Sequence, residues 1–129
     1  WSLFVEGGRL HYAHNDLEKK EYLVSSPQKL SPGRHTLGVR YRPTGRHLKP
    51  DYYLGDVELL VDGKPVARLE RMQSAAQYGA LTGCGLQVGR NEGTAVSRRY
   101  QAPFELTAAL EKVVIELDLR PVTLRPKRR

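Results

Sequence analysis

The chain has 129 residues, of which 21 are Lys or Arg and 14 are Asp or Glu, giving a formal net charge of +7. This length predicts one domain with one core, and no apolar run approaches the roughly 20 residues that a membrane-spanning helix needs. Five basic residues lie in the last ten positions, which leaves 16 to offset the 14 acids. Because no recognition motif or stacking platform accompanies this charge, we do not expect nucleic acid as a partner. The lack of a long apolar run likewise argues against a membrane as partner.

Short stretches of alternating apolar and polar residues dominate the chain, and Gly, Pro, Asn or Asp separate them. This pattern predicts an all-β domain. In chain order, Gly7-Gly8 predicts a first hairpin and Pro32-Gly33 a type II turn. Alternating strands are expected at 37–41 and 57–61, and Asp62-Gly63 predicts a tight hairpin after the second of them.

The second half of the chain is less regular. Residues 69–81 predict a loop with at most one or two helical turns. Apolar alternation predicts further strands at 84–88, which contains the lone Cys84, and at 113–119. With roughly nine to eleven short strands and no strand-helix-strand alternation, two antiparallel sheets packed face to face are expected. We expect residues 1–120 to form this domain and residues 121–129 to be a basic, extended or disordered tail.

No group of residues predicts catalysis or a metal site in this chain. His11 and His14 point to opposite faces of a strand, so they cannot hold one metal ion together. The acids show no spacing that singles out a catalytic pair, and no Gly-x-Ser-x-Gly elbow occurs. Asn91 and Glu92 could supply oxygen ligands to calcium, but Arg90 brings a positive charge to the same turn.

Sugar binding is the stronger functional alternative on these residues. The segment "HLKPDYYLGD" places two tyrosines in an expected loop, and aromatic rings stack on sugar faces. Basic residues nearby would suit sulfate groups. The carbohydrate-binding candidates are Tyr52, Tyr53 and Arg46.

Four segments in order resemble the C-terminal domain of large bacterial arylsulfatases: "WSLFVEGGRLHYAHN", "LSPGRHTLGVRY", "GDVELLVDGKPVARLE" and "GRNEGTAVSRRYQAPFELTAALEKVVIELD". That family opens the domain with a Gly-Gly, aromatic and Leu segment and has a Pro-x-Gly-x-His-Thr strand start. A Val-Asp-Gly-Lys hairpin follows, and a Gly-Thr-Pro-Val loop leads to the last strand. The resemblance covers Trp1 to about Leu119.

The resemblance implies a lectin-like jelly-roll, or concanavalin-like, sandwich behind a sulfatase catalytic domain. In sulfatases the catalytic residue is a formylglycine made within Cys/Ser-x-Pro-x-Arg, beside a divalent cation such as calcium. Here Cys84 precedes Gly85, Leu86, Gln87 and Val88, so the proline and arginine of that motif are missing. We therefore expect Cys84 to pack in the core, and no cofactor in this domain. The family's Gly-Thr-Pro-Val loop reads Gly-Thr-Ala-Val at residues 93–96, which puts a cation in that loop in doubt.

The leading interpretation is a non-catalytic accessory domain that packs on the catalytic domain of its own parent chain and supports the substrate entrance. A lectin-like module for sulfated glycans is the second interpretation, and a free-standing jelly-roll scaffold is the third. The cellular compartment, the oligomeric state and the parent's substrate stay open at this point.

Overall fold

A computed structural model describes residues 1–17, 19–49, 52–75 and 85–118, with the backbone alone for residues 45–49. These residues form eight strands in three antiparallel sheets, and they contain no helix. The expected all-β class is therefore confirmed. No helix that could cross a membrane is present in this described part of the chain.

Sheet A is built from the first three strands, in the order β1 (Ser2–Glu6), β2 (Arg9–Asp16) and β3 (Lys20–Ser25). Gly7 and Gly8 join β1 to β2 with φ angles of 59° and 75°. Positive φ at both central residues is what a two-residue hairpin with native strand twist requires. The hairpin predicted at Gly7-Gly8 is confirmed.

Sheet B contains the longest strands, in the order β4 (Leu37–Lys49), β5 (Tyr52–Val61) and β6 (Lys64–Ala75). The turn between β5 and β6 has φ angles of 52° at Asp62 and 77° at Gly63, as predicted. Register shifts follow Pro43 in β4, where proline cannot donate to the ladder. Within the described residues, β4 forms one edge of this sheet.

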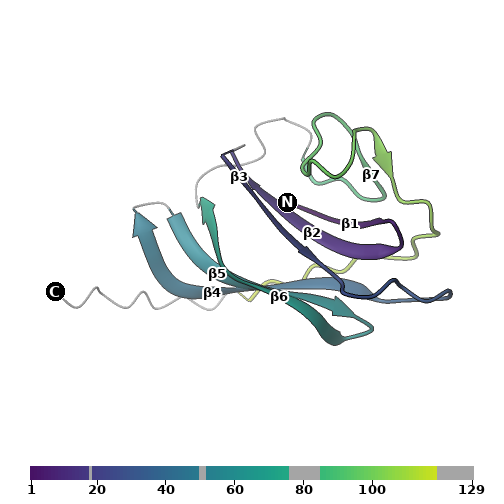
Figure 1. Cartoon of the computed structure of the whole chain (residues 1–129), viewed down its shortest axis with the longest axis horizontal. Coiled ribbons are helices and arrows are strands. Elements are labelled where there is room, and N and C mark those ends of the chain that lie inside the picture. The colour runs from purple at the N-terminus through teal and green to yellow at the C-terminus, as the bar shows by residue number, and fades with distance from the viewer. Residues whose placement is uncertain (18, 50–51, 76–84, 119–129) are drawn as a thin grey trace.

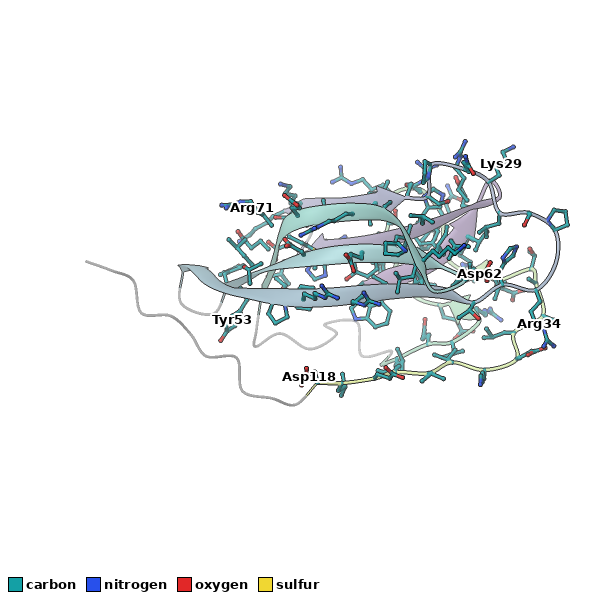
Figure 2. All side chains as sticks on the ribbon, turned by 90° about the horizontal axis from the view of Figure 1, so that it is seen from below. Lys29, Arg34, Tyr53, Asp62, Arg71 and Asp118 are labelled. Atoms are coloured by element: carbon teal, nitrogen blue, oxygen red, sulfur yellow. The ribbon has the colours of Figure 1, made fainter. Side chains whose placement is uncertain are left out.

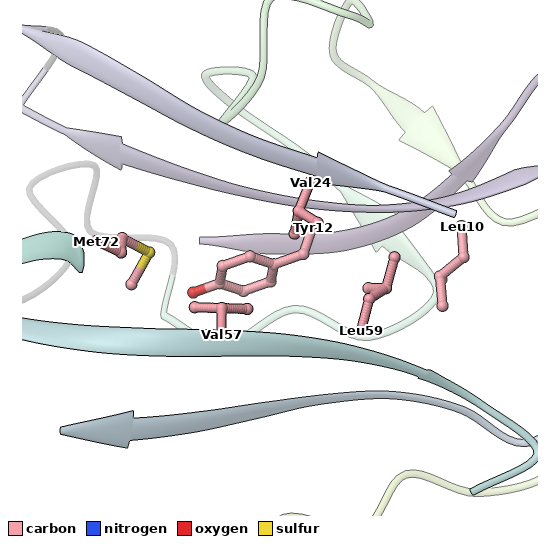
Figure 3. Close-up of a cluster of buried hydrophobic side chains, with 6 residues drawn as sticks. All are labelled: Leu10, Tyr12, Val24, Val57, Leu59 and Met72. Atoms are coloured by element: carbon pink, nitrogen blue, oxygen red, sulfur yellow. The ribbon is translucent and has the colours of Figure 1, made fainter. Parts of the chain in front are cut away.

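The two larger sheets face each other, with the main core between them (Figures 1 and 3). The alternation of apolar and acidic residues along β5 determines which face of sheet B packs against sheet A. Val57 and Leu59 are fully buried, while Asp56 and Glu58 lie on the other face of the strand. Six buried side chains from both sheets make the core cluster: Leu10, Tyr12, Val24, Val57, Leu59 and Met72.

A third, two-stranded sheet lies in the last part of the chain, where β7 (Arg90–Asn91) pairs with β8 (Phe104–Glu105). Its loop packs an aromatic cluster on sheet A, away from the main core. The Tyr100 ring stacks on Phe104 at 4.4 Å and meets Phe4 edge-on at 4.9 Å between ring centroids. The chain therefore covers both faces of sheet A (Figure 1).

Several strand predictions need correction. The described residues hold eight strands, and two of them span 13 and 12 residues, so the expectation of nine to eleven short strands is wrong for this part of the chain. The loop expected at 69–81 is wrong over 69–75, which continue β6, and residues 76–81 lie outside the described residues. Cys84 and the basic tail also lie outside them, so their predictions stay predictions.

The two late strands are absent from the described residues at 85–88 and 106–118. Gly85 and Gly89 have φ angles of 64° and 81°, which interrupt an extended strand. Residues 113–117 form no ladder with any other described residue. The apolar side chains that we expected to be buried in these strands are exposed instead, at 64% for Leu86, 55% for Ile115 and 76% for Leu117.

Candidate functional site

The three carbohydrate-binding candidates lie on sheet B. Tyr52 and Tyr53 begin β5 instead of lying in a loop, and Arg46 falls within β4. Both tyrosines are half-buried, and Tyr53 lies at the opposite end of sheet B from Asp62 (Figure 2). Consecutive strand residues point to opposite faces, so the two rings cannot stack together on one sugar.

A cleft of about 360 Å³ lies between sheet A and the loop that follows β7. Its lining combines two polar residues of sheet A with one turn of that loop: Asn15, Glu21, Thr94, Ala95, Val96, Ser97, Arg98 and Tyr100. This volume is near the lower end of the range for small-molecule sites.

The polar groups of the cleft hold the loop in place. The Ser97 hydroxyl donates to the Glu21 carboxylate, and the backbone N–H of Arg98 donates to the same carboxylate at 3.2 Å. Asn15 Nδ2 donates to the carbonyl of Val96 at 3.2 Å. Ser97 is 2% exposed. Because these groups already bond to one another, the cleft works as a clamp that fixes the loop on sheet A.

Sequence reasoning missed this clamp. Glu21 and Ser97 are 76 residues apart in the chain. A serine followed by two arginines is a weak local signal for a turn, but it does not indicate the strand against which the loop packs. Only the fold brings the carboxylate to the loop.

The turn considered for calcium is engaged in internal contacts. Arg90 Nε pairs with Glu92 Oε1 at 3.0 Å, and the Tyr100 hydroxyl donates to Asn91 Oδ1 at 2.8 Å. Within the described ranges, no group of three or more His, Cys, Asp or Glu side chains is placed to hold a metal ion.

The two histidines of β2 do lie on opposite faces, as predicted. His11 is 1% exposed, stacks on Phe4 at 5.1 Å and bonds through Nδ1 to Ser25 Oγ at 2.7 Å. It is therefore a buried structural histidine. On the other face, burial lowers the pKa of His14, whose Nδ1 has no hydrogen-bond partner among the described residues.

Ion pairs cover the outer face of sheet B. Arg40 Nη1 lies 3.1 Å from Glu58, and Arg68 Nη2 lies 3.0 Å from Asp56. The backbone N–H of Arg71, more than the Arg68 guanidinium, holds the pKa of Asp56 below its usual value. Such exposed pairs add little stability because water and salt screen them, and they give this face the character of a solvated surface.

Most of the exposed large apolar side chains among the described residues belong to segments outside the two large sheets, at residues 86–88 and 110–117. Four of them make what we call the C-terminal apolar surface: Leu86 (64% exposed), Val88 (53%), Leu110 (47%) and Val114 (65%). One backbone hydrogen bond links the chain next to these two segments, because the N–H of Leu106 donates to the carbonyl of Gly89 at 2.8 Å. Exposed apolar patches on soluble domains commonly mark interaction sites.

No protein-family model, no curated protein and no solved structure matches this chain.

Proposed function

We propose that this chain is a non-catalytic accessory domain of an arylsulfatase-type parent, with a jelly-roll β-sandwich fold. It packs against the parent's catalytic domain and supports the entrance to the substrate site. The parent, and not this domain, supplies the formylglycine and the calcium ion. The resemblance of the four sequence segments to the sulfatase C-terminal domain supports this assignment.

The structural observation that carries the proposal is the C-terminal apolar surface. Leu86, Val88, Leu110 and Val114 are each about half exposed or more, whereas ion pairs cover the outer face of sheet B. Covering an apolar side chain stabilises an interface by about 25 cal/mol per Å² removed from water. A neighbouring domain would therefore gain more by covering this surface than by covering the charged face.

Binding of sulfated glycans is the second proposal, with Tyr52, Tyr53 and Arg46 as its residues. The placement of the two rings on opposite faces of β5 removes the paired stacking platform that favoured it. A glycan array at moderate salt separates the two functions. Binding that is lost on Tyr53→Ala would favour the glycan module over the packing domain.

Two measurements test the leading proposal. The purified chain is assayed with a chromogenic sulfate ester and calcium, and we expect no turnover above buffer. Amide hydrogen exchange is then compared between the purified chain and the intact parent. We expect slower exchange at residues 86–88 and 110–114 in the parent. Turnover by this chain, or unchanged exchange at both segments, would overturn the proposal.

A further inference from the structure

We propose that residues 112–118 are a strap that closes on β4, at the edge that has no partner among the described residues, as a further strand of sheet B. This inference is independent of the proposed function, because it needs no partner. It concerns the odd-numbered apolar side chains of the strap and not the C-terminal apolar surface.

The strap lies beside an open edge of the sheet. The strand order leaves β4 with a partner on one side only among the described residues. Figure 1 shows the last part of the described chain at the level of sheet B, and Figure 2 shows it alongside β4 and running in the same direction. A long open edge presents unpaired N–H and C=O groups that can recruit another strand.

An ion pair holds the start of the strap at the start of β4. The Arg34 guanidinium, three residues before β4, pairs with the Glu111 carboxylate, one residue before the strap. The two side chains are 82% and 62% exposed. Such a solvated pair adds little stability, but it limits the registers in which the strap can meet β4.

Charge selects one register among those that remain. The outward positions of β4 carry Arg40, which already pairs with Glu58, and Arg42, which forms no ion pair with a described residue. The strap has acids at positions 116 and 118. Placing Glu116 beside Arg40 also places Asp118 beside Arg42, so both acids meet basic neighbours on the outer face.

The same register matches the apolar side chains. Leu37 and Val39 point inward and pack against the core cluster. Ile115 then lies beside Val39, and the other odd-numbered strap residues, Val113 and Leu117, lie beside Leu37 and Tyr41. A slip by one residue would turn the acids toward the core. Charge and apolar pattern therefore agree on one pairing.

Pro43 ends the pairing at the right place. It follows Arg42 directly, lacks an N–H and precedes the register shift in β4. The strap would thus pair with residues 36–42, remove three exposed apolar side chains from water and block this edge against other strands. Val113 and Leu117 are 52% and 76% exposed while the strap is open.

Paired cysteines test the strap in the full chain with Cys84→Ser as background. The matched pair is Arg40→Cys with Glu116→Cys, and the control is Arg40→Cys with Ile115→Cys, whose side chains face opposite sides of the closed sheet. Under mild oxidation we expect the matched pair to cross-link within a monomer at least about tenfold faster than the control. Non-reducing electrophoresis and mass spectrometry measure both products.

Three results would overturn the strap. Equal rates for the two pairs would show a freely moving segment, and no cross-link in either pair would show that the segment stays away from β4. A matched pair that links only between molecules would show that the segment adds to a second copy. The three positions that receive cysteines, Arg40, Ile115 and Glu116, are exposed, so these substitutions leave the described core intact.

Discussion

The ring of Tyr41 occupies the space above Gly55, one strand away. A Cβ built on Gly55 would lie 2.2 Å from Tyr41 Cε2, and the Tyr41 hydroxyl reaches to 3.5 Å from Ser74 Oγ on β6. The ring therefore crosses β5 at the one residue that has no side chain. This contact ties all three strands of sheet B together near the bend of β4.

We predict that Gly55→Ala displaces this ring and destabilises the chain by about 1–2 kcal/mol. The matched control is Gly38→Ala, whose added Cβ would lie at an ordinary 3.7 Å from Leu60 Cβ. Urea unfolding gives the free energy of unfolding of both variants. In a Tyr41→Ala background, Gly55→Ala should cause almost no further loss of stability, and an unchanged loss there would show that the ring is not the cause.

The core prediction concerns Leu59, which is fully buried between sheets A and B. Leu59→Ala leaves a cavity and should lower the free energy of unfolding by about 2–5 kcal/mol. Leu86→Ala is the control, because that side chain is 64% exposed and its loss should cost less than about 0.5 kcal/mol. Similar losses for the two variants would contradict the assigned core.

The loop clamp gives a proteolysis prediction. Glu21→Ala removes the acceptor for the Ser97 hydroxyl and the Arg98 N–H. The loop should therefore open more often, and the substitution should lower the free energy of unfolding by about 1 kcal/mol. We expect trypsin to cleave after Arg98 or Arg99 faster than in the unmodified chain. Glu70→Ala, on the exposed side of β6, is the control. Cleavage at the same rate in all three chains would rule out the clamp.

A pH prediction follows from the pair of His35 and Asp62. A hydrogen bond with Asp62 Oδ2 at 2.8 Å, together with the Ser31 carbonyl, raises the pKa of His35 above its usual 6.5. The Thr36 N–H and then His35 lower the pKa of Asp62 below 3.8. The raised histidine contributes stability that is complete below pH 6.5 and is lost as the pH rises through its folded pKa. The lowered aspartate contributes stability that is present above pH 3.8 and is lost as the pH falls.

Together these shifts place the strongest contribution of the pair between about pH 4 and 6.5. An NMR titration of the His35 ring should give a pKa above 6.5 that falls in Asp62→Asn. Asp56→Asn is the control and should leave the His35 titration unchanged. A His35 pKa that does not respond to Asp62→Asn would show that the pair is not formed.

Turn chemistry explains which parts of the fold could be predicted. Gly7-Gly8 and Asp62-Gly63 fix tight hairpins through their own positive φ angles, and the alternation of Val57 and Leu59 reports which face is buried. These signals depend only on residues that are adjacent in the chain, so a single sequence is enough to detect them. Tyr52 and Tyr53 show the limit of such signals, because proline and aspartate next to them suggested a loop where the chain pairs as β5.

Contacts distant in sequence could not be predicted in the same way. Alternation at Val113 to Leu117 indicates a strand, but a strand also needs a neighbour with free N–H and C=O groups. Whether residues 113–117 find one depends on β4, some 70 residues earlier in the chain. The clamp between Glu21 and Ser97 depends in the same way on the finished fold.

The most direct measurement for the account as a whole is the sequence of the same polypeptide upstream of Trp1, read from the intact gene product. We predict a Cys/Ser-x-Pro-x-Arg motif in that upstream region, as expected for a parent with a sulfatase catalytic domain. An upstream region of a full catalytic domain's length without that motif would contradict the assignment of this chain as a sulfatase accessory domain.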